Sequence, residues 1–154
     1  KQVSGSFSFG DDLSATHATG KLTVNTNSIT MGDEDLDLSL VDRTFLASSQ
    51  YPQSTFTIER FSTDSPSLAF GSLMLGVLEG HFFLKGKTIP IKAATEIEPV
   101  INADGEPRLL IRANWQINVR NFDIAEADGP EPAKHTVIID TNYQLHPMPA
   151  SKTP

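Results

Sequence analysis

The sequence LMLGVLEGHFFLKGKTIPIKAA, residues 73–94, indicates the class of fold. Two apolar segments, Leu73–Leu84 and Ile89–Ala94, flank the short polar segment Lys85-Gly86-Lys87-Thr88. A polar loop with a glycine between two such segments is typical of a β-hairpin. Pro90 has no N–H to donate to a ladder, so it suits an edge strand or the first residue of a strand. The stretch therefore predicts an antiparallel hairpin with long strands.

Both faces of the first strand of this hairpin are apolar, because side chains alternate across a strand. One face carries Leu73, Leu75, Val77 and Phe83, and the other carries Met74, Leu78, Phe82 and Leu84. A half-buried sheet would leave one face polar. Two interpretations follow. In a barrel, one face lines the interior while the other packs on a helical insert. In an ordinary two-sided core, both faces are simply buried.

The rest of the chain is also mostly β in pattern. Apolar and polar residues alternate over residues 3–9, 21–29, 55–61, 109–117 and 137–145, which predicts further strands. Six to eight strands at regular spacing predict an all-β fold, either a closed antiparallel barrel or a sandwich. The length of the strand that begins at Leu73 favours the barrel.

One region, residues 33–50, breaks the strand pattern. Apolar residues recur there at helical spacing: Leu36, Leu40, Val41, Phe45 and Leu46. We expect one or two short helices inserted around residues 33–50, ending before Tyr51-Pro52 because proline disfavours a helical predecessor. Residues 125–132 are acidic and contain prolines, which predicts a loop. Residues 1–146 should form a single domain, and the proline-containing residues 147–154 a flexible tail or linker that suits attachment to another domain.

Composition excludes several classes of function. The 154 residues carry a formal net charge of -7, without a basic cluster, so nucleic acid is not an expected partner. No apolar stretch is long enough to span a bilayer, and the first residues lack the basic-then-apolar pattern of a signal peptide. Cysteine is absent, which excludes disulfides and thiol chemistry.

Motifs for catalysis and for metals fail on inspection. Gly80 to Thr88 is one residue too long for a phosphate-binding P-loop, and its interior reads as a strand. The acidic residues that begin at Asp33 lack the glycine and the terminal glutamate of an EF-hand. The histidines His17, His81, His135 and His146 have no metal-ligand spacing. We therefore expect a protein that is not an enzyme, with no metal and no catalytic cofactor.

Several segments, in order along the chain, resemble the YceI-like family of lipid- and polyisoprenoid-binding proteins. They are Ser28-Ile29-Thr30 with Gly32 and Asp37, Tyr51-Pro52-Gln53-Ser54-Thr55-Phe56, Gly80 to Ile91, Ile117 to Ile124, and Val137 to Leu145. The family's opening strand would precede Val3. Either residues upstream of this sequence supply that strand, or the barrel closes differently.

The resemblance implies a lipocalin-like barrel with a hydrophobic tunnel for an isoprenoid quinone such as ubiquinone, a polyprenyl chain or a fatty amide. It implies a carrier, store or sensor in the bacterial periplasm or a secreted protein, often as a homodimer. Chemistry alone selects the candidates for tunnel lining on the long strands and on the helical insert: Met74, Leu78, Phe82, Leu84, Trp115, Phe45 and Leu46. Each is also a candidate for plain core. A second hypothesis for the function is a carbohydrate-binding or adhesion β-sandwich, in which aromatic residues such as Trp115 would stack on sugars.

Overall fold

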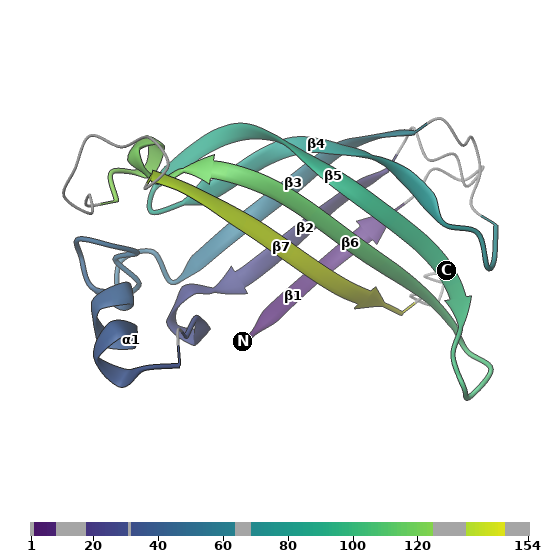
Figure 1. The fold of residues 1–154 in the computed structure, drawn as a ribbon, viewed down its shortest axis with the longest axis horizontal. Coiled ribbons are helices and arrows are strands. Elements are labelled where there is room, and N and C mark those ends of the chain that lie inside the picture. Colours follow the sequence, from purple (N-terminus) through teal and green to yellow (C-terminus); the bar gives the residue numbers. More distant parts are fainter. Residues whose placement is uncertain (1, 9–17, 31, 64–68, 125–134, 147–154) are drawn as a thin grey trace, which may run out of the picture.

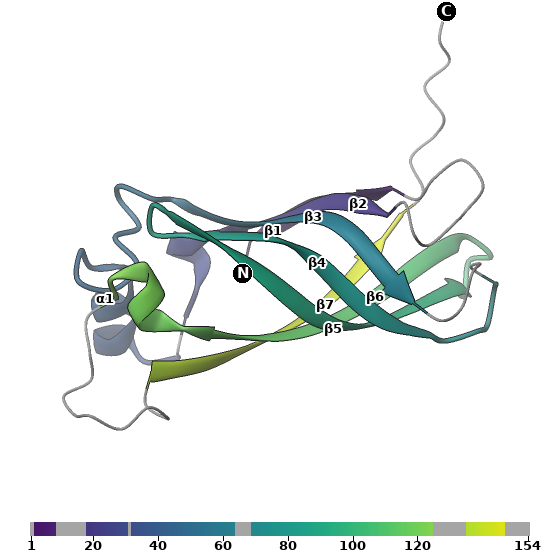
Figure 2. The same cartoon turned by 90° about the horizontal axis from the view of Figure 1, so that it is seen from above.

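A computed structural model of the chain describes residues 2–8, 18–30, 32–63, 69–124 and 135–146. The described strands form a single antiparallel sheet in which each strand pairs with the next along the chain. The strands are β1 (Val3–Ser8), β2 (Thr19–Asn25), β3 (Gln53–Thr63), β4 (Met74–Leu84), β5 (Lys87–Ile101), β6 (Pro107–Asn118) and β7 (Thr136–Leu145). The sheet curls strongly, as Figures 1 and 2 show. Its buried apolar side chains form one core cluster.

This arrangement confirms the all-β barrel class and rules out a sandwich, which needs two sheets packed face to face. The sheet order runs from β1 to β7 without a crossover, so β1 and β7 are its two edges. Because every neighbouring pair is antiparallel, these two edge strands run in the same direction. Among the described residues, no helix is long and apolar enough to cross a membrane.

The predicted hairpin is β4 and β5, joined by Lys85 and Gly86 alone. Both turn residues have positive φ, 47° and 78°, which is the backbone of a tight two-residue hairpin turn. Lys87 and Thr88, predicted as part of the loop, are instead the first residues of β5. Pro90 tolerates its place in β5 because β6 pairs with β5 only from Ala94 onward, which leaves Pro90 on a local edge.

Only one face of β4 is buried. Met74, Leu78, Phe82 and Leu84 belong to the core, whereas Leu73 and Leu75 are largely exposed. The interpretation of an ordinary two-sided core is therefore wrong. The helical insert does not cover the outer face of β4 either, because it lies at one end of the sheet (Figure 2).

The helical insert consists of helix α1 (Glu34–Val41) followed by turns up to Gln50. The Asp33 side chain begins the helix by accepting a hydrogen bond from the Leu36 N–H, 3.1 Å away. No residue of α1 is fully buried, although Leu40 packs partly against the core. The strand predicted for residues 21–29 ends at Asn25, whose side chain caps the short 3-10 helix η2 (Thr26–Ser28). The loop predicted at residues 125–132 and the tail at residues 147–154 lie outside the described residues.

The helical end of the sheet is held together by Lys85, from the β4–β5 turn. Its Nζ donates hydrogen bonds to the carbonyl oxygens of Thr44, 2.9 Å away, and Asp123, 2.6 Å away. Asp123 follows the 3-10 helix η3 (Val119–Phe122). Partial burial lowers the pKa of Lys85, and the charges of Asp123 and Asp42 oppose that shift. One side chain thus links the turns after α1, the central hairpin and η3.

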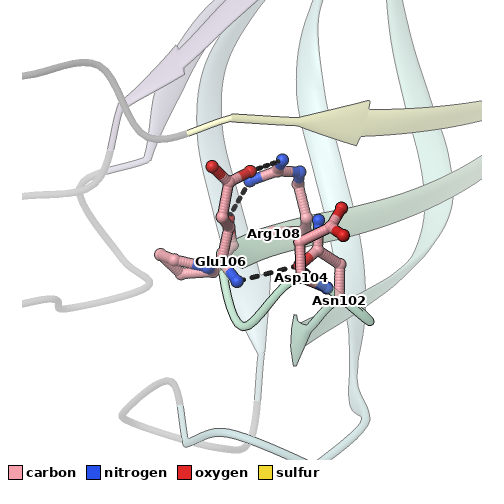
Figure 3. Close-up of polar contacts among 5 residues, drawn as sticks. Asn102, Asp104, Glu106 and Arg108 are labelled. Atoms are coloured by element: carbon pink, nitrogen blue, oxygen red, sulfur yellow. Dashed lines mark hydrogen bonds and ion pairs between the residues drawn. The ribbon is translucent and has the colours of Figure 1, made fainter.

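The opposite end of the sheet contains the polar turn between β5 and β6, drawn in Figure 3. The Asn102 side-chain oxygen accepts hydrogen bonds from the N–H groups of Asp104 and Glu106, at 3.0 and 2.8 Å. Glu106 forms an ion pair with the buried guanidinium of Arg108, and this contact lowers the pKa of Glu106. These hydrogen bonds and this ion pair therefore all form within the turn and the first residues of β6.

The two lysines of the central hairpin allow a matched test of the link made by Lys85. Replacing it with methionine removes two charged hydrogen bonds, and we expect the free energy of unfolding to fall by about 2 kcal/mol. Lys87→Met removes only the exposed ion pair of Lys87 with the Asp123 carboxylate, at 2.6 Å, and should cost about 0.5 kcal/mol or less. Urea unfolding of both variants measures the difference. An equal loss of unfolding free energy in both variants would show that Lys85 does not link the loops.

A glycine allows the close contact between β3 and β4. A Cβ added at Gly80 would lie 2.0 Å from the Thr57 carbonyl oxygen, so backbone would have to move. We expect Gly80→Ala to lower the free energy of unfolding by about 3 kcal/mol. Thr88→Ala, at an exposed position of the same hairpin, should change it by less than about 0.5 kcal/mol. Thermal unfolding followed by circular dichroism compares the stabilities of the two variants. A Gly80→Ala variant as stable as the unmodified protein would disprove the close contact.

Candidate functional site

The inward face of the sheet is an apolar core built around aromatic rings. The Trp115 ring, from β6, lies 5.4 Å from the Phe56 ring on β3 and 5.7 Å from the Phe82 ring on β4. Phe82 in turn lies 5.8 Å from Phe122 of η3. Since β3 and β6 are not neighbours in the sheet, these contacts connect opposite sides of the interior near its helical end.

Burial decreases from the middle of the sheet to its two edges. The inward side chains of β4, β5 and β6 that face the core are mostly buried, whereas Val3 on β1 is 45% exposed and Val137 on β7 is 43% exposed. Other inward side chains of these strands are half-buried. We call the inward apolar side chains of the two edge strands the inner edge residues: Val3, Phe7, Val137, Ile139, Tyr143 and Leu145. They are apolar surface that faces the interior and that no further strand covers in the described part of the chain.

The structure brings most of the residues predicted to line a tunnel into one cluster. Its members are Met74, Leu78, Phe82, Leu84, Trp115 and Leu46, all of them buried. Phe45 differs, because it lies in the turns after α1 with 39% of its surface exposed. The role of these residues in ligand binding stays a prediction.

Sequence reasoning did not include the inner edge residues among the candidates. The alternation of β7 did place Val137, Ile139, Tyr143 and Leu145 on one face. However, nothing in the pattern distinguishes an edge strand with an open inner face from a central strand. That distinction depends on sheet order, which only the structure provides.

The charged side chains that form ion pairs between strands lie largely on the outer face of the sheet. Glu79 contacts Lys92 at 3.0 Å and Arg60 at 2.5 Å, and these hydrogen bonds, Lys92 first, lower the pKa of Glu79. Towards the interior, burial raises the pKa of the Tyr143 phenol, opposed by a hydrogen bond with Thr141. The inner edge residues therefore carry no charge at neutral pH, which suits an uncharged apolar ligand.

Two grooves on the surface contain polar side chains, and Val3 is the only inner edge residue that lines either of them. One, of about 460 Å³, crosses the outer face of β4–β7, where Arg112 pairs with Glu96 at 3.3 Å and Asn114 hydrogen-bonds to Asp140. The other, of about 530 Å³, includes Gln2, whose side-chain oxygen accepts a hydrogen bond from Asn25. Each groove therefore contains at least one pair of polar side chains that contact one another.

The described residues contain no group of three or more His, Cys, Asp or Glu residues placed to hold a metal. His81 contacts Glu59 on the exposed surface at 2.8 Å, His135 is buried, and His17 lies outside the described residues. The absence of enzymatic activity stays a prediction. Stacking of Trp115 on a sugar does not fit its buried position.

Comparison with known proteins agrees with this geometry. The model of the YceI-like domain matches residues 1–145. A UPF0312 protein of Enterobacter sp. (strain 638) is 27% identical over 142 residues, which are 90% of this chain and 68% of that protein.

Solved structures share the fold. The YCEI protein of Campylobacter jejuni superposes with a TM-score of 0.79 at 19% identity, over 97% of this chain and 83% of that one. BcnA of Burkholderia cenocepacia gives 0.71 at 15% identity, over 94% and 84% of the two chains. A polyisoprenoid binding domain from Saccharophagus degradans, implicated in plant cell wall breakdown, gives 0.55 at 16% identity, over 69% and 59%. The match of the family model over nearly the whole chain shows that the protein belongs to the YceI-like family.

Proposed function

We propose that this protein binds a long-chain apolar lipid against the inward face of its curled sheet and carries out no reaction on it. The observation that carries the proposal is the partly exposed apolar surface of the inner edge residues. Such surface is unfavourable in water, and a hydrocarbon chain laid along it would remove it from water.

The strength of such binding follows from the ligand's length. Each CH₂ group removed from water contributes roughly 0.8 kcal/mol, so a long chain binds tightly without any charged contact. The apolar, uncharged side chains of the inner edge residues supply the surface, and the buried core behind them supplies a rigid wall. Affinity of this kind selects for length and apolar character more than for a particular headgroup.

An isoprenoid quinone or a polyprenyl chain is the ligand that we favour within this class. Support comes from the fold shared with the Saccharophagus degradans domain, which is described as polyisoprenoid binding. A protein that shelters such a chain from water would act as a carrier, a store or a sensor of it. We propose the bacterial periplasm, or secretion, as the setting.

Neighbouring isoleucines on β7 provide a matched test. Ile139 is an inner edge residue next to Trp115 in the ladder, whereas Ile138 points outward and is exposed. Placing a carboxylate in an apolar binding surface is costly. We therefore expect Ile139→Glu to weaken lipid binding about tenfold or more, while Ile138→Glu binds like the unmodified protein.

Native mass spectrometry of freshly purified protein, followed by organic extraction, measures the lipid that copurifies with each variant. Titration with an added quinone compares their affinities. The proposal is wrong if the unmodified protein carries no lipid and ignores added quinones. Equal lipid affinities of both variants would show that the ligand does not contact the inner edge residues.

A further inference from the structure

We propose that the indole N–H of Trp115 is the polar anchor for the bound lipid, and that the ligand is therefore an apolar chain with a neutral oxygen acceptor. Quinones, esters and amides belong to this class, whereas pure hydrocarbons and anionic phosphates do not. The inference rests on the proposed function and specifies its ligand.

Trp115 is a buried hydrogen-bond donor that lacks an acceptor among the described residues. Trp115 is only 5% exposed, and its Nε1 has no hydrogen-bond partner among the described residues. The indole N–H can only donate, and buried polar groups in proteins are almost always paired. The Phe56 and Phe82 rings that pack against Trp115 offer no oxygen acceptor. A partner that arrives with a ligand would satisfy the donor.

The position of Trp115 fits this role. In the ladder of β6 and β7 it lies directly opposite Ile139, an inner edge residue. It is therefore one strand in from the open edge, beside the surface on which the proposed chain lies. The contacts of its ring with β3 and β4 hold the indole in place before a ligand binds.

Other buried polar atoms are weaker candidates. The Arg108 Nε also lacks a partner among the described residues, but the rest of that guanidinium already contacts Glu106 and the Pro107 carbonyl oxygen. The Ser48 hydroxyl is unpaired as well, but it can donate or accept and so selects no ligand class. Of these three groups in the described part of the chain, only Trp115 combines a donor-only group with a place beside the inner edge residues.

Charge decides between neutral and anionic acceptors. Arg108 is the only lysine or arginine among the fully buried residues that the structure describes, and Glu106 already pairs with it. The whole chain carries a formal net charge of -7. A buried phosphate or carboxylate would find no free cation there, and an isolated buried charge is costly. A carbonyl or ether oxygen needs only the single N–H.

Nuclear magnetic resonance can observe the anchor directly, because Trp115 is the only tryptophan of the chain. A nitrogen–proton correlation spectrum of labelled protein therefore shows one indole signal. The probes are an alkyl-substituted benzoquinone and the alkylbenzene with the same tail. We expect the quinone to move the indole proton downfield, as hydrogen bonding does, and the alkylbenzene to leave it close to its free position.

The variant Trp115→Phe tests the same contact by affinity. Phenylalanine keeps an aromatic ring but has no N–H. The smaller ring should weaken the binding of both probes by the loss of packing, whereas the loss of the hydrogen bond should weaken the binding of the quinone alone. Calorimetric titrations should show the ratio of quinone to alkylbenzene affinity fall about tenfold in the variant. Should the variant fail to fold, the spectrum of the unmodified protein decides.

The outcomes separate the two proposals. If both probes bind and the indole signal responds equally to each, the anchor is refuted and lipid binding stands. If neither probe binds the unmodified protein, the proposed function fails and the anchor fails with it. A downfield shift with the quinone alone, together with the reduced affinity ratio, establishes Trp115 as the anchor.

Discussion

The fold depends on the way that one sheet must bury its own inward face. A sheet with one apolar face usually covers that face with helices or with a second sheet. Here α1 lies at one end, and the sheet covers its inward face by curling on itself (Figures 1 and 2). Strands in the middle of the sheet have neighbours on both sides and bury their inward side chains well. The edge strands β1 and β7 each have one neighbour, so their inward side chains remain partly exposed.

Because burial is higher in the middle strands than in the edge strands, the molecule has a closely packed side and an open side. The closely packed side includes β3 to β6, where rings from non-adjacent strands meet and Gly80 allows the backbones to approach closely. Lys85 holds the loops of the helical end against this side. Among the described residues, the open side has no comparable set of aromatic contacts. A ligand that binds there would meet a preformed surface, which reduces the entropy that binding must overcome.

The sequence predicted the class of fold well because strand periodicity is a local signal. The hairpin of residues 73–94 and the parity of Ile111, Trp115 and Ile117 follow directly from alternation, and the structure confirms both. The helical insert was also visible, because its apolar spacing differs from that of a strand. The tight Lys85-Gly86 turn was predicted too long, since polar residues can begin a strand as easily as they fill a loop.

Features that depend on long-range contacts were not predictable. Leu73 and Leu75 are apolar like core residues, yet they stay exposed on the outer face because α1 lies at one end of the sheet. The candidates chosen for a binding site were apolar side chains on the long strands and on the helical insert, and most of these are buried in the core. The apolar surface that faces inward and stays partly exposed instead belongs to residues that are ordinary in sequence and distinctive only by their place at the sheet edges.

The balance between affinity and selectivity explains why a single polar atom matters in such a site. A buried donor without a partner costs about 1–3 kcal/mol, which equals the contribution of roughly one to four CH₂ groups. In our proposal the bound lipid gains most of its affinity from chain length, and a hydrogen bond to Trp115 adds only a modest increment. That increment is nevertheless enough to distinguish lipids of equal length. A wall of apolar side chains cannot make that distinction, because it contacts every hydrocarbon tail in the same way.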